Sequence, residues 1–224
     1  MSVTHHPNDA TLMEFAAGSL SEPLAIVVAS HLELCSVCRS AMPIFSEIGG
    51  AFMVREVQAP PEEEAAYERL LARLDNDSTV TPAFEGRARE ASASAGDLPS
   101  SLARLVRGGL DSIEWRKVIP GADDWQLHFQ TSDGDHSLRF LRAQPGRELP
   151  EHSHAGTELT LVLRGALRDG NKILMRGDVT DLDNEGTHNP VVHGDEPCFC
   201  VIANEGPPRF KALKMRILQK LIGI

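Results

Sequence analysis

The stretch Gly146–Gly165, GRELPEHSHAGTELTLVLRG, decides the fold of the second half of this chain. Its two histidines, His152 and His154, are two residues apart, so both point to the same face of a β-strand. Glu158 follows six residues after His152, in the same phase, beyond a bend at Gly156. Two imidazoles and a carboxylate from one hairpin form a borderline-hard metal site that suits zinc, iron, manganese or nickel.

Short strands are predicted on both sides of this motif. Leu159, Leu161 and Leu163 alternate along the chain, which indicates a buried strand face. Many short strands separated by turn residues favour an all-β sandwich or barrel. Cys198 and Cys200 fall on one face of the last strand, where parallel side chains favour two buried small residues over a mutual disulfide. The candidate strands are 113–119, 124–130, 136–143, 157–164, 171–174 and 197–203.

The spacing G-x5-H-x-H-x3-E-x6-G, with both bounding glycines, resembles the first motif of the cupin family in every position. This resemblance implies a jelly-roll barrel and a further metal-ligating histidine in a second motif. Gly177–Asp178 opens that second motif, and His188 stands where the family places the ligand. The family's P-x-G turn is replaced here by Asp183–Asn184–Glu185, so His193 remains a competing candidate.

A second group of potential ligands lies near the N-terminus, where His31, Cys35 and Cys38 form the pattern H-x3-C-x2-C. On one helix these positions share a face, so an imidazole and two thiols can converge. Zinc takes four such ligands in a tetrahedron, and paired cysteines in a cytosolic chain favour metal or redox chemistry over disulfides. His5 and His6 are candidates for the fourth ligand, and His6 is favoured because it directly precedes a proline and the first helix. A closed site of this kind is structural or redox-responsive rather than catalytic.

The chain divides into a helical part and a β part. Helical patterns are expected at about 8–18, from residue 21 onward, at 36–48 and at 62–74. Residues 76–104 are rich in Ala, Ser, Gly and Asp and are expected to be a flexible linker. We therefore predict an α + β multidomain protein, with an all-α zinc-binding domain at 1–75 and an all-β cupin barrel at 105–224.

Charge and hydropathy exclude some classes of protein. The net charge of −10 argues against direct binding to nucleic acid, because phosphate contacts need a basic surface. Residues 1–80 carry −8 of this charge, and such an acidic module suits either a basic protein partner or plain solvation. We expect no transmembrane helix and no secretory signal peptide, which leaves the cytoplasm as the default compartment.

The segment His31–Cys38, with a histidine and a short helix upstream, resembles the zinc-binding anti-sigma domain. Joined by a linker to a cupin, it is similar to the ChrR family of anti-sigma factors over nearly the whole chain. The resemblance implies the ligands His6, His31, Cys35 and Cys38 and a heterodimer with an extracytoplasmic-function sigma factor, with the fourth helix packed between the sigma domains. It also implies release of the sigma factor on oxidative signals such as singlet oxygen, with the cupin taking part.

The alternative is a cupin-type metal enzyme, such as a dioxygenase, with the N-terminal zinc module as a docking attachment. Such an enzyme would keep an open position on a cupin metal held by three histidines and one glutamate. The sequence offers no further base or nucleophile beyond the ligands, so we expect a regulator and no enzyme. The cupin metal would be zinc or another divalent transition metal.

Overall fold

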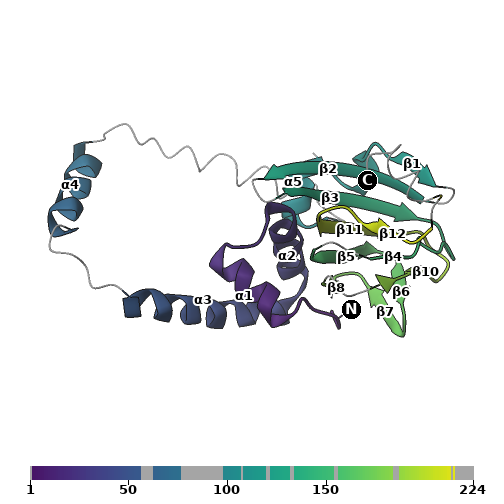
Figure 1. The fold of residues 1–224 in the computed structure, drawn as a ribbon, viewed down its shortest axis with the longest axis horizontal. Helices are drawn as coiled ribbons and strands as arrows, with labels where there is room; N and C mark the ends of the chain where they lie inside the picture. Colours follow the sequence, from purple (N-terminus) through teal and green to yellow (C-terminus); the bar gives the residue numbers. More distant parts are fainter. Residues whose placement is uncertain are drawn as a thin grey trace.

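The computed structural model describes residues 2–56, 63–76, 98–106, 108–119, 122–131, 134–153, 156–183, 187–212 and 214. Within these ranges, five α-helices come first and a β-rich part follows (Figure 1). This order confirms the predicted combination of an all-α N-terminal part with an all-β C-terminal part. His154 and the turn residues Asn184 and Glu185 lie outside the described residues.

The helices begin where the sequence supplies caps. In α1 (Asp9–Ala17), the Asn8 side chain accepts a hydrogen bond from the Thr11 amide, and Gly18 ends the helix with φ 69°. A left-handed residue in that position is cheapest when it is glycine, because no Cβ is strained. Pro23 stands in the first turn of α2 (Glu22–Leu34), where its missing N–H has no helical partner to lose.

The third helix is longer than predicted. Instead of ending at residue 48, α3 (Ser36–Glu56) continues through Gly49 and Gly50. Neither glycine adopts a positive φ, so the pair does not form the turn that its composition suggested. The fourth helix, α4 (Glu63–Asn76), matches its predicted range closely and stands apart from the rest of the molecule (Figure 1).

Three antiparallel sheets form the β-rich part. The largest has the order β1-β2-β3-β11-β5-β8, and the two smaller ones have the orders β10-β6-β7 and β12-β4-β9. The six strands of the large sheet are β1 (Arg116–Ile119), β2 (Ala122–Thr131), β3 (Gly134–Ala143), β11 (Cys198–Glu205), β5 (Glu158–Arg164) and β8 (Val179–Leu182). The short strands are β4 (His152–Ser153), β6 (Ala166–Asp169), β7 (Lys172–Met175), β9 (Thr187–His188), β10 (Val191–His193) and β12 (Arg209–Phe210).

Both faces of the large sheet are covered. Leu159, Leu161 and Leu163 of β5 belong to the same buried cluster as Val27 and Val28 of α2. Val162, on the opposite face of β5, packs with residues of β6, β7 and β10 instead. The leucine alternation therefore marks the face that the helices cover, while the other face lies between the sheets. Burial on two faces explains why β5 has an almost continuous apolar sequence.

A short helix links the two parts. Helix α5 (Ser100–Val106) falls in the segment expected to be linker, and it packs against α2. The Glu33 carboxylate accepts hydrogen bonds from the amides of Ser100 and Ser101 at 2.7 and 3.1 Å. An acidic group at a helix N-terminus satisfies free N–H groups and complements the helix dipole. A one-turn 3₁₀ helix, η1 (Leu110–Ser112), then leads into β1.

Among the described residues, no single helix is long and apolar enough to cross a membrane. Helices α1 and α2 pass that test only when they are taken together across a bend of 109°.

The packing between α2 and the sheet predicts how two substitutions change the free energy of unfolding. We expect Leu161→Ala to lower the free energy of unfolding by about 2–5 kcal/mol, because it opens a cavity at a fully buried position. The matched control is Ile173→Ala on β7, whose side chain is 43% exposed and which should change stability by less than about 0.5 kcal/mol. Urea titration measures both, and equal small effects would contradict the described packing.

Candidate metal sites

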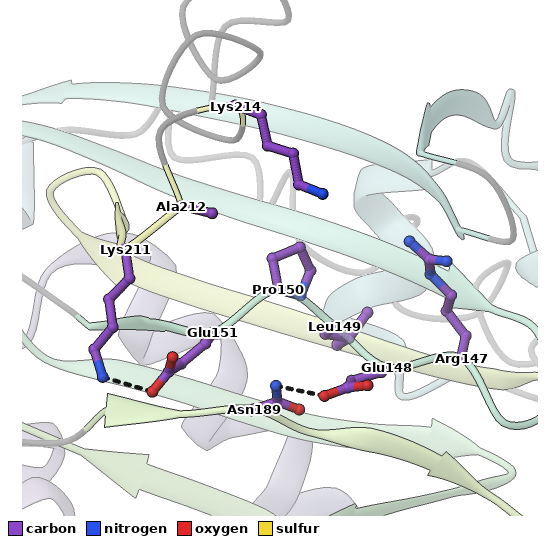
Figure 2. A pocket seen from close by; sticks show the side chains of 9 residues that line it. All are labelled: Arg147, Glu148, Leu149, Pro150, Glu151, Asn189, Lys211, Ala212 and Lys214. Atoms are coloured by element: carbon purple, nitrogen blue, oxygen red, sulfur yellow. Dashed lines mark hydrogen bonds and ion pairs between the residues drawn. The ribbon is translucent and has the colours of Figure 1, made fainter.

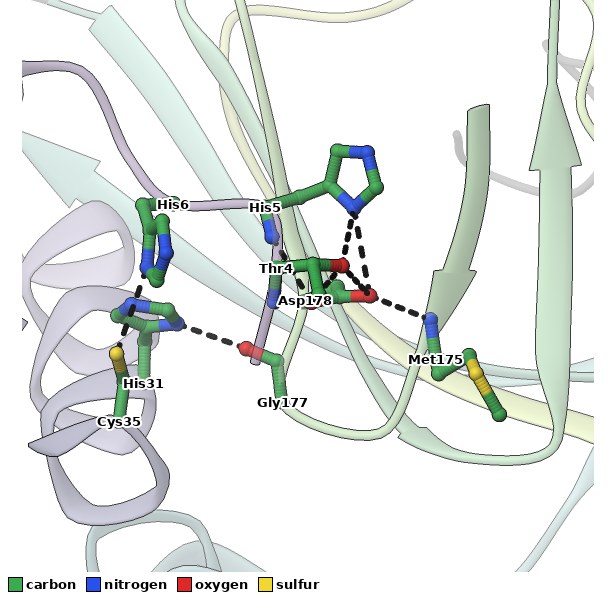
Figure 3. Close-up of polar contacts among 8 residues, drawn as sticks. All are labelled: Thr4, His5, His6, His31, Cys35, Met175, Gly177 and Asp178. Atoms are coloured by element: carbon green, nitrogen blue, oxygen red, sulfur yellow. Dashed lines mark hydrogen bonds and ion pairs between the residues drawn. The ribbon is translucent and has the colours of Figure 1, made fainter. Parts of the chain in front are cut away.

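The structure brings the four N-terminal candidate ligands together. One donor atom from each of His6, His31, Cys35 and Cys38 lies within 4.8 Å of all the others. His6 Nδ1 is 3.4 Å from Cys35 Sγ and 3.3 Å from Cys38 Sγ. The rings of His6 and His31 meet edge to face, with centroids 5.7 Å apart. His5, the alternative to His6, points its ring toward Asp178 instead (Figure 3).

The H-x3-C-x2-C segment does not lie on one helix, contrary to the expectation of a shared helical face. Cys35 has extended backbone angles, φ −111° and ψ 108°, and separates α2 from α3. Its Sγ accepts a hydrogen bond from the Cys38 amide at 3.4 Å, so it caps the first turn of α3. His31 therefore comes from the last turn of α2 and Cys38 from the first turn of α3.

The His31 ring is oriented for binding through one nitrogen. Its Nδ1 donates a hydrogen bond to the carbonyl oxygen of Gly177 at 2.8 Å. Its Nε2 is buried and has no hydrogen-bond partner among the described residues. A buried polar atom without a partner is costly, and metal ligation by the nitrogen opposite a hydrogen-bonded one is the usual arrangement of histidine ligands. Burial also lowers the pKa of His31, which keeps the imidazole neutral.

The two thiols can bind a metal once they lose their protons. Burial and the neighbouring Cys35 raise the pKa of the Cys38 thiol to about 12. A bound zinc ion reverses this effect, because a coordinating thiol loses its proton outright. Two thiolates and two neutral imidazoles, all supplied by the protein, are a donor set that fits tetrahedral zinc.

A second cluster lies in the β-rich part. The donor atoms of His152 (β4), Glu158 (β5) and His188 (β9) lie within 4.8 Å of one another. The Nε2 atoms of the two histidines are 3.3 Å apart, and His188 Nε2 is 3.6 Å from Glu158 Oε1. His152 and His188 are also register partners between β4 and β9. His154, the remaining predicted ligand, lies outside the described residues.

Hydrogen bonds at the other ring nitrogens aim both histidines at one point. His152 Nδ1 donates to the Pro150 carbonyl at 2.8 Å, and His188 Nδ1 donates to the Asp169 carboxylate at 2.9 Å. Burial, with the neighbouring His188, lowers the pKa of His152 to about 4, so its ring is neutral. Burial lowers the pKa of His188 too, but Asp169 and Glu158 more than offset this and raise it overall.

Two further residues that the sequence did not single out hold Glu158. The Asn204 amide and the Thr160 hydroxyl each donate a hydrogen bond to its carboxylate. Burial raises the pKa of Glu158, while these donors and His188 lower it. Asn204 faces Glu158 in the register of β11 with β5, a pairing that no local sequence pattern reveals.

His193 and the second cysteine pair take no part in this cluster. His193 is exposed on β10, opposite Ala166 of β6. Cys198 and Cys200 are buried free thiols in the apolar layer between the sheets, in keeping with the predicted role of small core residues.

An open hollow of about 600 Å³ lies on the surface of the β-rich part, and none of the three converging residues lines it (Figure 2). Its wall includes Pro150 and Glu151, which precede His152, and Asn189, which follows His188. Several of its polar groups are already paired: Lys211 with Glu151 at 2.6 Å, and Asn189 with Glu148 at 2.8 Å. The lining residues are Arg147, Glu148, Leu149, Pro150, Glu151, Asn189, Lys211, Ala212 and Lys214.

A helical part with a His/Cys cluster packs on a β-fold that carries a His/Glu cluster, which defines a protein with two candidate metal sites. The family of ChrR cupin-like domains matches residues 105–207. Over its full length the chain is 35% identical to the full-length anti-sigma-E factor ChrR of Cereibacter sphaeroides. The chain belongs to the ChrR family of anti-sigma factors. This membership confirms the expected class, a regulator rather than an enzyme.

A solved structure agrees with this assignment. The crystal structure of Rhodobacter sphaeroides SigE in complex with the anti-sigma ChrR is matched with a TM-score of 0.70 and 32% identity, over 91% of this chain and 100% of that one. An RmlC-like cupin protein from Ralstonia eutropha is matched with a TM-score of 0.41 and 19% identity, over 47% of this chain and 71% of that one.

The geometry separates the two candidates for the last cupin ligand. We expect His188→Ala to weaken metal binding at the His152 cluster by more than about 100-fold. Loss of a residue that is only hydrogen-bonded to a metal ligand costs roughly 10–100-fold. His193→Ala is the matched control and should keep the metal, because its side chain lies outside the cluster. Metal content after dialysis measures both variants. Loss of metal from His193→Ala alone would reverse the assignment.

Proposed function

We propose that this protein is a zinc-dependent anti-sigma factor that binds an extracytoplasmic-function sigma factor and withholds it from RNA polymerase. The observation that carries the proposal is the similarity of the full chain to an anti-sigma factor. The chain also matches an anti-sigma factor whose structure was solved in complex with a sigma factor. The helical part would bind the sigma factor as a heterodimer, and the cupin would take part in its release. Because RNA polymerase is the competing partner, the protein would act in the cytoplasm.

Exposed apolar residues on α3 and α4 support a protein partner. Ile44, Ile48 and Phe52 follow one another every four residues, so they form one stripe along α3. Phe52 is 65% exposed and Leu70 of α4 is 54% exposed. Apolar stripes of this kind on a surface mark interaction sites. The full set is Val37, Ile44, Ile48, Phe52 and Met53 on α3, with Tyr67, Leu70 and Leu71 on α4.

Zinc at His6, His31, Cys35 and Cys38 would fix the angle between α2 and α3. The proposed ligands come from the segment before α1, the end of α2, the break and the start of α3, so one ion would tie three elements together. Small modules of this kind derive folding free energy from the metal. The apolar stripe of α3 would then be presented in one direction relative to the cupin.

The cupin cluster would bind zinc or another divalent transition metal through His152, His154, Glu158 and His188. Three of these residues converge, and His152 and His188 are partly exposed rather than fully buried. A cluster that is partly open to solution suits a sensor of an oxidative signal, such as singlet oxygen. No observation favours the alternative of a dioxygenase-like enzyme over this regulatory role.

Transcription tests the function directly. In run-off transcription with RNA polymerase and the cognate sigma factor, the purified chain should inhibit the sigma-dependent promoter. Cys35→Ala should weaken sigma binding by about tenfold or more, because it removes a zinc ligand and the folding energy that the metal supplies. Ser36→Ala, the matched control at the next position, should inhibit like the wild type. Undiminished inhibition by metal-free protein would refute the zinc requirement.

The surface is tested separately from the metal. Phe52→Glu and Leu70→Glu, each at an exposed position, should weaken sigma binding about tenfold or more while leaving zinc content and helicity unchanged. Ile173→Glu places the same charge on an exposed apolar residue of the cupin and should bind normally. Isothermal titration calorimetry gives the dissociation constants. Wild-type affinity for the sigma factor in both Phe52→Glu and Leu70→Glu would place the sigma-binding surface elsewhere.

A further inference from the structure

One turn of the cupin contacts both the helix end that carries His31 and the N-terminal segment that carries His6. This turn, Gly177–Asp178, lies between β7 and β8. The Gly177 carbonyl accepts the hydrogen bond from His31 Nδ1 at 2.8 Å. The Asp178 side chain holds Thr4 and His5, the residues directly before His6 (Figure 3).

The Asp178 carboxylate ties the N-terminal segment to the cupin. Its Oδ1 accepts from the amides of Thr4 and His5 at 2.7 and 3.0 Å, and its Oδ2 accepts from the Met175 amide at 2.8 Å. Burial raises the pKa of Asp178, but these donors outweigh it and lower the pKa overall, so the group is ionised. Hydrogen bonds from amides to a carboxylate are about twice as strong as those between neutral groups.

Backbone contacts fix the same segment in position. The Val179 amide donates to the His5 carbonyl at 3.1 Å, so residue 5 pairs with the free edge of β8. Gly177 has φ +92°, and a Cβ there would lie 2.7 Å from Val3 Cγ2. Only glycine allows so close an approach, so the turn and the N-terminal segment fit each other.

We infer that Gly177 and Asp178 are positioning residues for the N-terminal metal site, so that the cupin directly determines how firmly the helical module holds its metal. Gly177 fixes the tautomer and direction of His31, which leaves Nε2 for the metal. Asp178 anchors the chain one residue before His6. The inference rests on the proposed zinc site formed by His6, His31, Cys35 and Cys38.

The turn also adjoins β5, the strand that carries Glu158 of the second cluster. The Val162 amide donates to the Asp178 carbonyl at 3.1 Å, and the Gly177 amide donates to the Val162 carbonyl at 2.9 Å. Val162 lies four residues after Glu158 on β5. Hydrogen bonds thus connect β5, which carries Glu158, to the Gly177–Asp178 turn, and that turn to His31 and to the residue before His6.

Zinc release from the full-length protein tests the inference. In a His152→Ala background, which removes the second metal, a chromogenic chelator reports the rate of zinc loss from the N-terminal site. Asp178→Ala should lose this zinc roughly tenfold faster. Residues that hold metal ligands in place typically contribute at least about tenfold to metal affinity. Asp195→Ala, an exposed aspartate elsewhere in the cupin, is the matched control and should release zinc at the wild-type rate.

A second variant separates positioning from damage to the cupin. Thr4→Pro removes the Thr4 N–H and hydroxyl donors and leaves every cupin residue intact, and it should accelerate zinc loss similarly. Wild-type rates for both variants, or for Thr4→Pro alone, overturn the inference. If Asp178→Ala fails to fold, Thr4→Pro decides. Zinc content that does not fall in His31→Ala refutes the zinc site itself, which distinguishes that failure from failure of the positioning role.

Discussion

The packing of α2 against the six-stranded sheet is the contact on which the rest of the molecule depends. Val27 and Val28 are completely buried in that layer. Rotation of the helix about its axis would expose these two side chains. His31 follows one turn later, and the fixed rotation directs its ring at the Gly177 carbonyl. The N-terminal cluster therefore forms at the end of a helix whose orientation the β-sheet sets.

The two clusters differ in how they relate to their surroundings. The N-terminal set comes from the segment before α1, the end of α2, the break at Cys35 and the start of α3. His31, Cys35 and Cys38 are buried, His6 is half-buried, and His31 is hydrogen-bonded to a carbonyl of the β-rich part. The cupin set comes from β5 of the large sheet and from the short strands β4 and β9, and Asp169 and Asn204 are hydrogen-bonded to its ligands. The first set joins helices to one another, and the second joins two sheets.

Local sequence patterns predicted most of the fold and named the residues that the structure brings together in the two clusters. Caps, prolines and apolar spacing located α1, α2 and α4, and alternation located the long strands. The strands β6, β8 and β10 were missed because their sequences, ALRD, VTDL and VVH, show no apolar alternation. The equally short β1 and β7 were found because clear turn residues lie beside them. The break at Cys35 was missed because H-x3-C-x2-C fits a continuous helix equally well. Asp169, Asn204 and Asp178 act across long sequence separations, which only the sheet register and the docking of the helices bring together.

The pairing of His5 with β8 has a consequence beyond the metal. As the outermost strand of its sheet, β8 would otherwise present free backbone N–H and C=O groups, which invite strands from other molecules. The N-terminal segment covers part of that edge. A chain that sheds this segment, by proteolysis or by loss of its anchoring carboxylate, would expose a template for edge-to-edge association. Protection against aggregation is thus built into the first few residues of the protein.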